Sequence, residues 1–132
     1  MQQVVATLCY LLRDGQVLMI RGKKPSAPHY NLWNGVGGKL EEEDQGDPIR
    51  CITREVVEET GYTLIDPVLS GAIRFTGMFP DQEWLVYIYS CTEFLGELRQ
   101  SAQEGPLRWF DREELAAVPM VAGDYIFVAW VL

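Results

Sequence analysis

The sequence predicts an α/β protein in which a mixed β-sheet lies between helices, as an α/β/α sandwich. Short apolar segments rich in strand-forming residues occur on both sides of one well-delimited helix, and a second helical segment is expected near the C-terminus. The chain has 132 residues, of which 48% are hydrophobic, and this suits one domain with a proper core. No repeat or linker divides it, so residues 1–132 are interpreted as a single domain.

The first strands are predicted before residue 40. Val4–Leu12 is rich in strand formers, and Gln16–Ile20 can pair back with it through a turn at Arg13–Gly15. Gly22–Tyr30 contains prolines and lysines and is typical of a loop. Leu32–Lys39 is predicted to be a short strand that runs into a glycine-rich turn, where another group can approach the backbone closely.

One central helix is predicted over Pro48–Thr60, after an acidic loop at Glu41–Gly46. Asp47 is a favourable N-cap, proline suits the first helical position, and Gly61 provides the C-terminal stop. The apolar residues that recur at helical spacing are expected to face the core: Ile49, Ile52 and Val56.

The second half is predicted to be mostly strand, over Leu64–Phe75, Trp84–Ser90 and Leu107–Phe110. Asp111 is expected to cap a short helix that ends at about Ala117, and a last helix is expected from Asp124 to the C-terminus. The tryptophans expected in the core are Trp84, Trp109 and Trp130.

Composition excludes several classes of protein. The net charge of −8 argues against a duplex-DNA binder, which needs a basic face. The apolar runs are too short to cross a bilayer, so no membrane partner is expected. The three cysteines are odd in number and lie among apolar residues, which favours buried, reduced thiols in a cytoplasmic protein.

Three glutamates of the central helix, Glu55, Glu58 and Glu59, stand at positions i, i+3 and i+4 and therefore share one face. Like charges at this spacing repel by a few tenths of a kcal/mol per pair. A hard divalent cation such as Mg²⁺, with Mn²⁺ as a substitute, would turn this repulsion into coordination. Arg54 can hold the array through an i,i+4 pair with Glu58. The alternative is a simple solvated helix face.

The stretch Gly37–Glu41, a loop, and then Arg54–Tyr62 (REVVEETGY) together resemble the Nudix box of the MutT-like hydrolases. The second half of the box matches in full. The spacing from Gly38 to Arg54 is two residues longer than in the family, which indicates an insertion in the loop. Counted forward from Gly38, the first acidic position of the box falls on Asp44, and counted back from Arg54 it falls on Gly46.

The order of motifs along the rest of the chain is similar to the branch of the family that sanitises oxidised purine nucleotides. By this resemblance Asn34, Phe75 and Asp124 line a nucleobase pocket, and Glu104 is a further metal ligand or base. Two pocket positions differ: Val121 stands about where some members have a stacking tryptophan, and Gly123 stands where mammalian-type members have a second aspartate.

The activity implied by the resemblance is Mg²⁺-dependent hydrolysis of a nucleoside triphosphate to the monophosphate and pyrophosphate. A purine substrate is implied, including an oxidised one such as 8-oxo-dGTP. Lys39, Lys23 and Arg21 are placed to contact phosphates. The sequence leaves open whether Glu58, Glu59 or Glu104 is the general base. The implied metal ligands are the Gly37 carbonyl, Glu55, Glu58, Glu59 and Glu104.

Other interpretations stay open for single residues and for the whole chain. Glu104 could be a surface residue, Asp124 a plain N-cap, Phe75 a core aromatic and Lys23 a solvated loop residue. The rival functions are hydrolysis of a pyrimidine triphosphate, nucleotide sugar or ADP-ribose, a nucleotide sensor without turnover, and an isoprenoid diphosphate isomerase. The small-molecule nucleotide is the expected partner of a monomer or homodimer.

Overall fold

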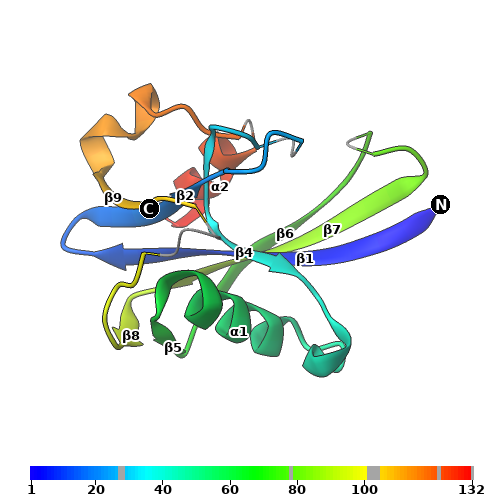
Figure 1. Ribbon diagram of the computed structural model, residues 1–132, viewed down its shortest axis with the longest axis horizontal. Coiled ribbons are helices and arrows are strands. Elements are labelled where there is room, and N and C mark those ends of the chain that lie inside the picture. Colours follow the sequence, from blue (N-terminus) through cyan, green and yellow to red (C-terminus); the bar gives the residue numbers. More distant parts are fainter. Residues whose placement is uncertain (27–28, 78, 101–104, 122, 132) are drawn as a thin grey trace.

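A computed structural model describes residues 1–26, 29–77, 79–100, 105–121 and 123–131 (Figure 1). The elements in chain order are β1 (Gln2–Arg13), β2 (Gln16–Arg21), β3 (Trp33–Asn34), β4 (Val36–Lys39), the 3₁₀ helix η1 (Glu42–Asp44), α1 (Pro48–Thr60), β5 (Thr63–Ile65), β6 (Val68–Thr76), β7 (Gln82–Cys91), β8 (Glu93–Leu95), β9 (Leu107–Asp111), the 3₁₀ helix η2 (Arg112–Ala117) and α2 (Asp124–Val131).

The main sheet is mixed and has the strand order β3-β2-β1-β7-β6, with β4 also paired to β1 and β9 to β2. β1 and β7 run parallel, whereas the other neighbours are antiparallel. Helix α1 lies on one face of this sheet, and α2 lies on the other (Figure 1). The structure therefore confirms the predicted sandwich on a mixed sheet.

Alternation along β1 supplies both halves of the core. Cys9 and Leu11 point to the side of α1, where they join Ile52 and Val56 of the helix. Ala6 and Tyr10 belong to the opposite layer, which includes Phe127 and Val128 of α2. The sheet is thus buried on both faces at its centre.

The central helix has the predicted ends, but one apolar residue is misplaced. The Asp47 side chain accepts a hydrogen bond from the Ile49 amide at 3.0 Å, and Gly61 takes the left-handed conformation with φ 85°. Ile49 is 49% exposed, so its predicted place in the core is wrong. It lies in the first turn, where the helix has not yet reached its packing partners, and Cys51 is buried instead.

Several predicted boundaries change where the backbone turns. The strand predicted over residues 64–75 is interrupted at Asp66, which has φ 49°, and at Pro67, which cannot donate a hydrogen bond. It forms β5 and β6, and β5 pairs with β8, a strand that was not predicted. Gly35 likewise separates β3 from β4, and the acidic loop contains η1.

The remaining predictions about burial divide by residue type. Cys9, Cys51 and Cys91 are buried free thiols, as expected. Trp84 and Trp109 are half-buried, but Trp130 is 45% exposed, so its assignment to the core is wrong. Among the described residues no helix has both the length and the apolar character needed to cross a membrane.

Candidate active site

Two glycines of β4 bring the strand into direct contact with the acidic face of α1. The Gly37 amide donates a hydrogen bond to Oε1 of Glu59 at 2.9 Å. A Cβ atom on Gly38 would lie only 2.6 Å from the carboxyl carbon of Glu55, and one on Gly37 would lie 2.0 Å from the Thr7 carbonyl oxygen. Only glycine allows this approach, which explains the paired glycines before Lys39.

The Arg54 guanidinium is the centre of an ion-pair network on α1. Its Nε and Nη2 atoms donate to the two oxygens of Asp44 at 3.0 and 2.9 Å, a bidentate arrangement. The same guanidinium pairs with Glu55 at 2.9 Å and with Glu58 at 3.3 Å. One cation therefore fixes carboxylates from the loop and from the helix.

Asp44 shows how the longer loop is joined to the helix. It ends η1, is buried, and also accepts a hydrogen bond from the Glu41 amide at 2.9 Å. Hydrogen bonding to Arg54 lowers the pKa of Asp44 to about 2. Asp44, the residue predicted for the first acidic position of the box, thus forms an ion pair with Arg54 and ties the loop to α1.

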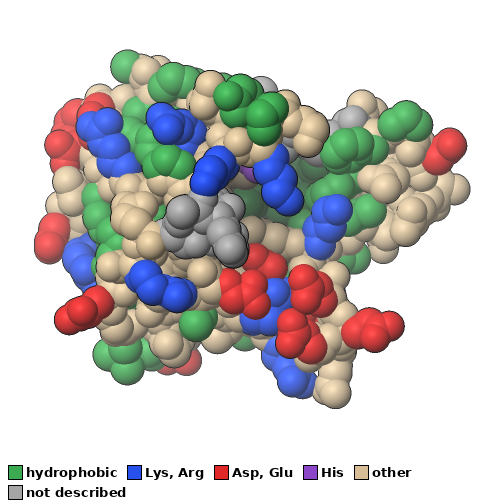
Figure 2. Space-filling model, in the orientation of Figure 1, with side chains coloured by type: hydrophobic (Ala, Val, Ile, Leu, Met, Phe, Trp, Pro, Cys, Tyr) green, Lys and Arg blue, Asp and Glu red, His purple; other side chains and the backbone are tan. Residues whose placement is uncertain are grey.

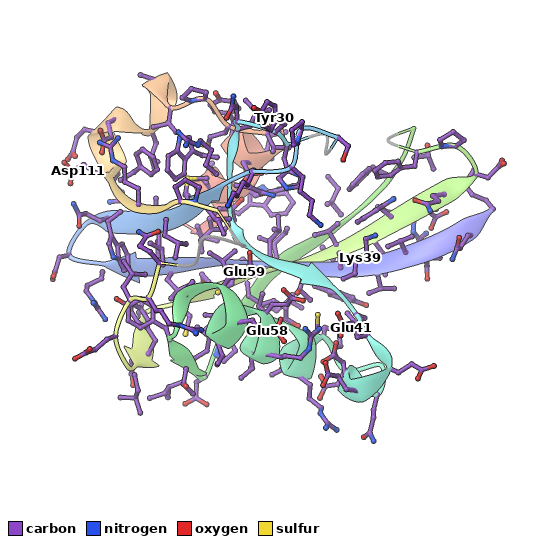
Figure 3. The ribbon with its side chains drawn as sticks, viewed as in Figure 1. Tyr30, Lys39, Glu41, Glu58, Glu59 and Asp111 are labelled. Atoms are coloured by element: carbon purple, nitrogen blue, oxygen red, sulfur yellow. The ribbon has the colours of Figure 1, made fainter. Side chains whose placement is uncertain are left out.

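The three glutamates of α1 occupy different environments. Glu59 is buried, Glu58 has a side chain that is 51% exposed, and Glu55 lies between them in exposure. Burial raises the pKa of Glu55, while Arg54 acts in the opposite direction. Figure 3 shows Glu58 and Glu59 on α1, below β4, with Lys39 on β4 to their right.

These carboxylates have the chemistry of a divalent-cation site, but they are not yet arranged as one. In the described part of the chain, no three Asp, Glu, His or Cys side chains converge into a ready-made metal site. The reason is visible in the network, since Glu55 and Glu58 are turned toward Arg54. The groups that could supply oxygen ligands to a divalent cation here are the carboxylates of Glu55, Glu58 and Glu59 and the Gly37 carbonyl.

A hollow crosses the molecule beside these carboxylates, with acidic side chains on one side and basic side chains along the opposite rim (Figure 2). Lys39 follows the two glycines, and its Nζ lies 5.4 Å from the centre of the Trp84 ring. Arg21 and Lys23, with Tyr30, line a cavity of about 580 Å³ that includes none of the α1 glutamates. Lys39 thus follows the glycines that contact the carboxylates, with its ammonium on Trp84, whereas Lys23 lines the separate cavity.

Two of the residues predicted to read a base, Asn34 and Asp124, lie at the chain segment just before Gly37, one in the sequence and the other through a contact with Gly35. Asp124 is 1% exposed and accepts hydrogen bonds from the Tyr10 hydroxyl at 2.5 Å and the Gly35 amide at 2.9 Å. Burial raises the pKa of Asp124 to about 6. The Oδ1 atom of the neighbouring Asn34 is buried and has no hydrogen-bond partner among the described residues.

Phe75 lies on β6 against an aromatic group that sequence reasoning missed. Its ring stacks on Trp84 with centroids 6.3 Å apart, and Phe79 lies 5.9 Å from the same indole. Trp84 was assigned to the core, yet it is only half-buried and carries Lys39 on one side. Tyr10 was also missed, because a tyrosine in an apolar strand gives no sequence signal for a buried aspartate partner. Glu104, the last predicted site residue, lies outside the described residues.

Comparison with known proteins agrees with this architecture. A family model described as the NUDIX domain matches residues 2–131. The chain is 31% identical over 122 residues to the uncharacterized Nudix hydrolase YvcI of Bacillus subtilis, covering 89% of this chain and 72% of that protein. It is 30% identical over 122 residues to the oxidized purine nucleoside triphosphate hydrolase of Danio rerio, covering 92% and 74%.

Among solved structures, the MutT NUDIX hydrolase of Burkholderia pseudomallei superposes with a TM-score of 0.85 at 27% identity, over 100% of both chains. Members of this family generally use divalent metal cations. The family model covers nearly the whole chain, and the glycines of β4 meet the glutamates of α1 as described above. The chain therefore belongs to the Nudix family and is a MutT-like hydrolase.

Proposed function

We propose that the protein hydrolyses purine nucleoside triphosphates, oxidised ones such as 8-oxo-dGTP among them, to the monophosphate and pyrophosphate with Mg²⁺. The observation that carries the choice of substrate is the short chain segment that joins two sets of groups. At one end, the amide of Gly35, which follows Asn34, donates a hydrogen bond to Asp124. At the other end, Gly37 and Gly38 contact the Glu59 and Glu55 side chains of α1. Three residues of extended chain span at most about 10 Å, which suits a nucleoside with its base at one end and its phosphates at the other.

The acidic end suits phosphate chemistry once cations are bound. Mg²⁺ would supply charge neutralisation of the phosphates and a more acidic water, held by Glu55, Glu58, Glu59 and the Gly37 carbonyl. Glu58 is the most exposed of the three glutamates and can accept a proton from water. Lys39 can leave the Trp84 ring and reach phosphate oxygens, since its side chain is long and exposed.

The other end suits a base edge with both donors and acceptors. The buried, unpaired Oδ1 of Asn34 calls for a donor, which a ring N–H or an exocyclic amino group would provide. Asp124 has a pKa of about 6 and can take up a proton to act as a donor itself. The stacked rings of Phe75 and Trp84 offer a further flat surface, on β6 and β7. The similarity to the purine nucleotide hydrolase of Danio rerio supports the same choice.

The test is a panel of purine, oxidised purine and pyrimidine triphosphates, nucleotide sugars and ADP-ribose, assayed for phosphate and pyrophosphate release with Mg²⁺. We expect purine triphosphates to have the highest kcat/KM and to release pyrophosphate. The Asn34→Ala variant should lose kcat/KM for purines by about 10-fold or more, because each well-placed hydrogen bond to a base contributes about 1–3 kcal/mol. Equal turnover of purines and pyrimidines would reject the base assignment while leaving the hydrolase assignment intact.

A further inference from the structure

Helix α2 has an unusual outward face. Its inward residues, Asp124, Phe127, Val128 and Val131, follow the spacing i, i+3, i+4, i+7 expected of a helix packed on a sheet. A surface helix normally carries charged or polar residues on the opposite side. Here the outward side has no charged residue, and Ile126 is 54% exposed. The exposed outward residues are Tyr125, Ile126, Ala129 and Trp130.

Strand β6, on which α2 rests, is a free edge of the sheet. Of the described strands only β7 pairs with it. Natural edge strands are usually protected by charges, prolines or bulges. The only charged residue of β6 is Arg74, which is held by Glu83 at 2.9 Å. A bulge between Leu69 and Gly71 bends the start of the strand, but the pairing from Gly71 to Thr76 is regular.

The outward face of α2 and the edge of β6 form one continuous surface. They meet at Trp130, whose ring covers Gly71: a Cβ atom on this glycine would lie 2.7 Å from the ring. Val68 and Leu69 extend the same apolar character along the strand, since both are exposed. We call this region the β6–α2 surface. Val68, Ile126 and Trp130 lie on the α2 side of the sheet edge, and Leu69 and Ala72 lie on its α1 side, since they pair with Tyr89 and Tyr87 of the α1-side core.

We propose that the β6–α2 surface is a homodimer interface in which the β6 edges of two copies pair antiparallel about a twofold axis. A free strand edge is matched by another extended strand, and a second copy supplies the identical, self-complementary edge. An axis perpendicular to the sheet puts both α2 helices on the same face, so their apolar outward sides meet over the junction. Two chains of net charge −8 repel, and this surface is poor in charge, so they can approach here.

The experiment is sedimentation velocity from about 0.1 to 100 μM protein, a range that brackets the Kd of a moderate interface. The wild type should reach twice the monomer mass with rising concentration. Ile126→Glu should remain monomeric over the same range, because it buries a charge in an apolar contact. Raising NaCl should keep or strengthen the dimer, since it screens the repulsion between the two chains.

The matched control is Leu95→Glu on β8, a residue that is 63% exposed and lies outside the β6–α2 surface. It should dimerise like the wild type. Ala72→Glu tests the strand side independently, and thermal midpoints measured beside the wild type verify that each variant folds. A wild type that stays monomeric at every concentration, or a dimer that survives both Ile126→Glu and Ala72→Glu, would overturn the proposal. Equal dissociation by Leu95→Glu would overturn it as well.

Discussion

At the scale of single residues, the site depends on carboxylates whose environments differ although their side chains are similar. Glu59 is buried on a backbone amide, Glu55 is shielded between β4 and Arg54, and Glu58 is open to solvent. Burial dominates the pKa of Asp124 and raises it, against the opposing effect of the hydrogen bonds from Tyr10 and Gly35. Because their environments differ, Glu58 and Asp124 are tested by different substitutions and measurements.

Glu58→Gln should reduce kcat by about 100-fold or more, because the amide neither coordinates a hard cation well nor accepts a proton from water. The fold should be preserved, since the side chain keeps its size and lies half in solvent. Steady-state kinetics and a thermal melt measure the two effects. Glu113→Gln, on the exposed side of η2, serves as the control and should change neither. Normal turnover with a lowered melting temperature would make Glu58 a structural residue.

Asp124→Asn should stabilise the protein above pH 6. The pKa of Asp124 rises to about 6 in the folded state from 3.8, so its contribution is favourable below pH 3.8 and is lost as the pH rises through 6. This shift corresponds to about 3 kcal/mol at neutral pH. Both hydrogen bonds reach one oxygen, Oδ2, which an amide oxygen can replace.

Urea unfolding of Asp124→Asn and wild type from pH 4 to 8 checks this expectation. The gain of the variant should grow with pH and level off above about pH 7. Asp81→Asn, at an exposed turn position that asparagine tolerates, should show no such trend. A constant difference at all pH values would mean that Asp124 does not titrate in this range.

At the scale of elements, a few local signals predicted α1 and β4 well, and tertiary contacts decided the rest. Asp47, Pro48 and Gly61 delimited the helix because capping is a local interaction. The exposure of Ile49 could not be inferred from its spacing. Helical periodicity predicts the direction of a side chain, but it does not show whether another element packs against that side chain. Strand β8 escaped notice because its three residues gain their structure from pairing with β5.

Asp44→Asn should loosen the connection between η1 and α1. The pKa of Asp44 is lowered to about 2 from 3.8, so its stabilising effect is present above pH 3.8 and disappears as the pH falls through 2. The variant should lose about 2 kcal/mol at pH 7 and converge with the wild type near pH 2. Glu42→Gln, an exposed acidic residue of the same η1 element, is the control. A loss that does not depend on pH would contradict the ion-pair explanation.

Gly37→Ala and Gly38→Ala should separate stability from activity. A methyl group on Gly37 collides with the Thr7 backbone at 2.0 Å, so this variant should lose stability. On Gly38 it collides with the Glu55 carboxyl group, a side chain that can move, so activity should fall more than stability. Melting temperatures and kcat/KM of the two variants give the comparison. The same ratio of effects in both would show that the two glycines act alike.

At the scale of the whole molecule, the sandwich places two groups of acidic side chains beside one chain segment, Asn34–Gly38: Asp124 contacts Gly35, and the glutamates of α1 contact Gly37 and Gly38. The sequence predicted the class of fold and the glutamate array, because both are written in local patterns and a family motif. The structure confirms the Arg54–Glu58 pair that helical spacing predicted. The carboxylates of η1 on the same guanidinium could not be predicted, since no spacing shows how the loop returns to the helix. The contacts of Trp84 with Lys39 and Phe75 could not be predicted either, because they depend on how separate strands pack together.

Removal of divalent cations should stop activity without unfolding the protein. EDTA should abolish hydrolysis and shift the thermal midpoint by only a few degrees, because Arg54 already balances part of the negative charge of α1. Mg²⁺ should restore full turnover, and Mg²⁺ with a non-hydrolysable nucleotide should raise the midpoint by mass action. Calorimetry with and without chelator tests this. Unfolding on chelation would show instead that the cation is needed for the fold.

The guanidinium of Arg54 has a consequence for the life of the chain after synthesis. A helix with so many carboxylates carries its own counter-charge, so the newly made polypeptide can reach its finished shape in surroundings poor in magnesium. If hydrolysis needs Mg²⁺ as proposed, the supply of the ion would set when the catalyst works, with the architecture in place beforehand.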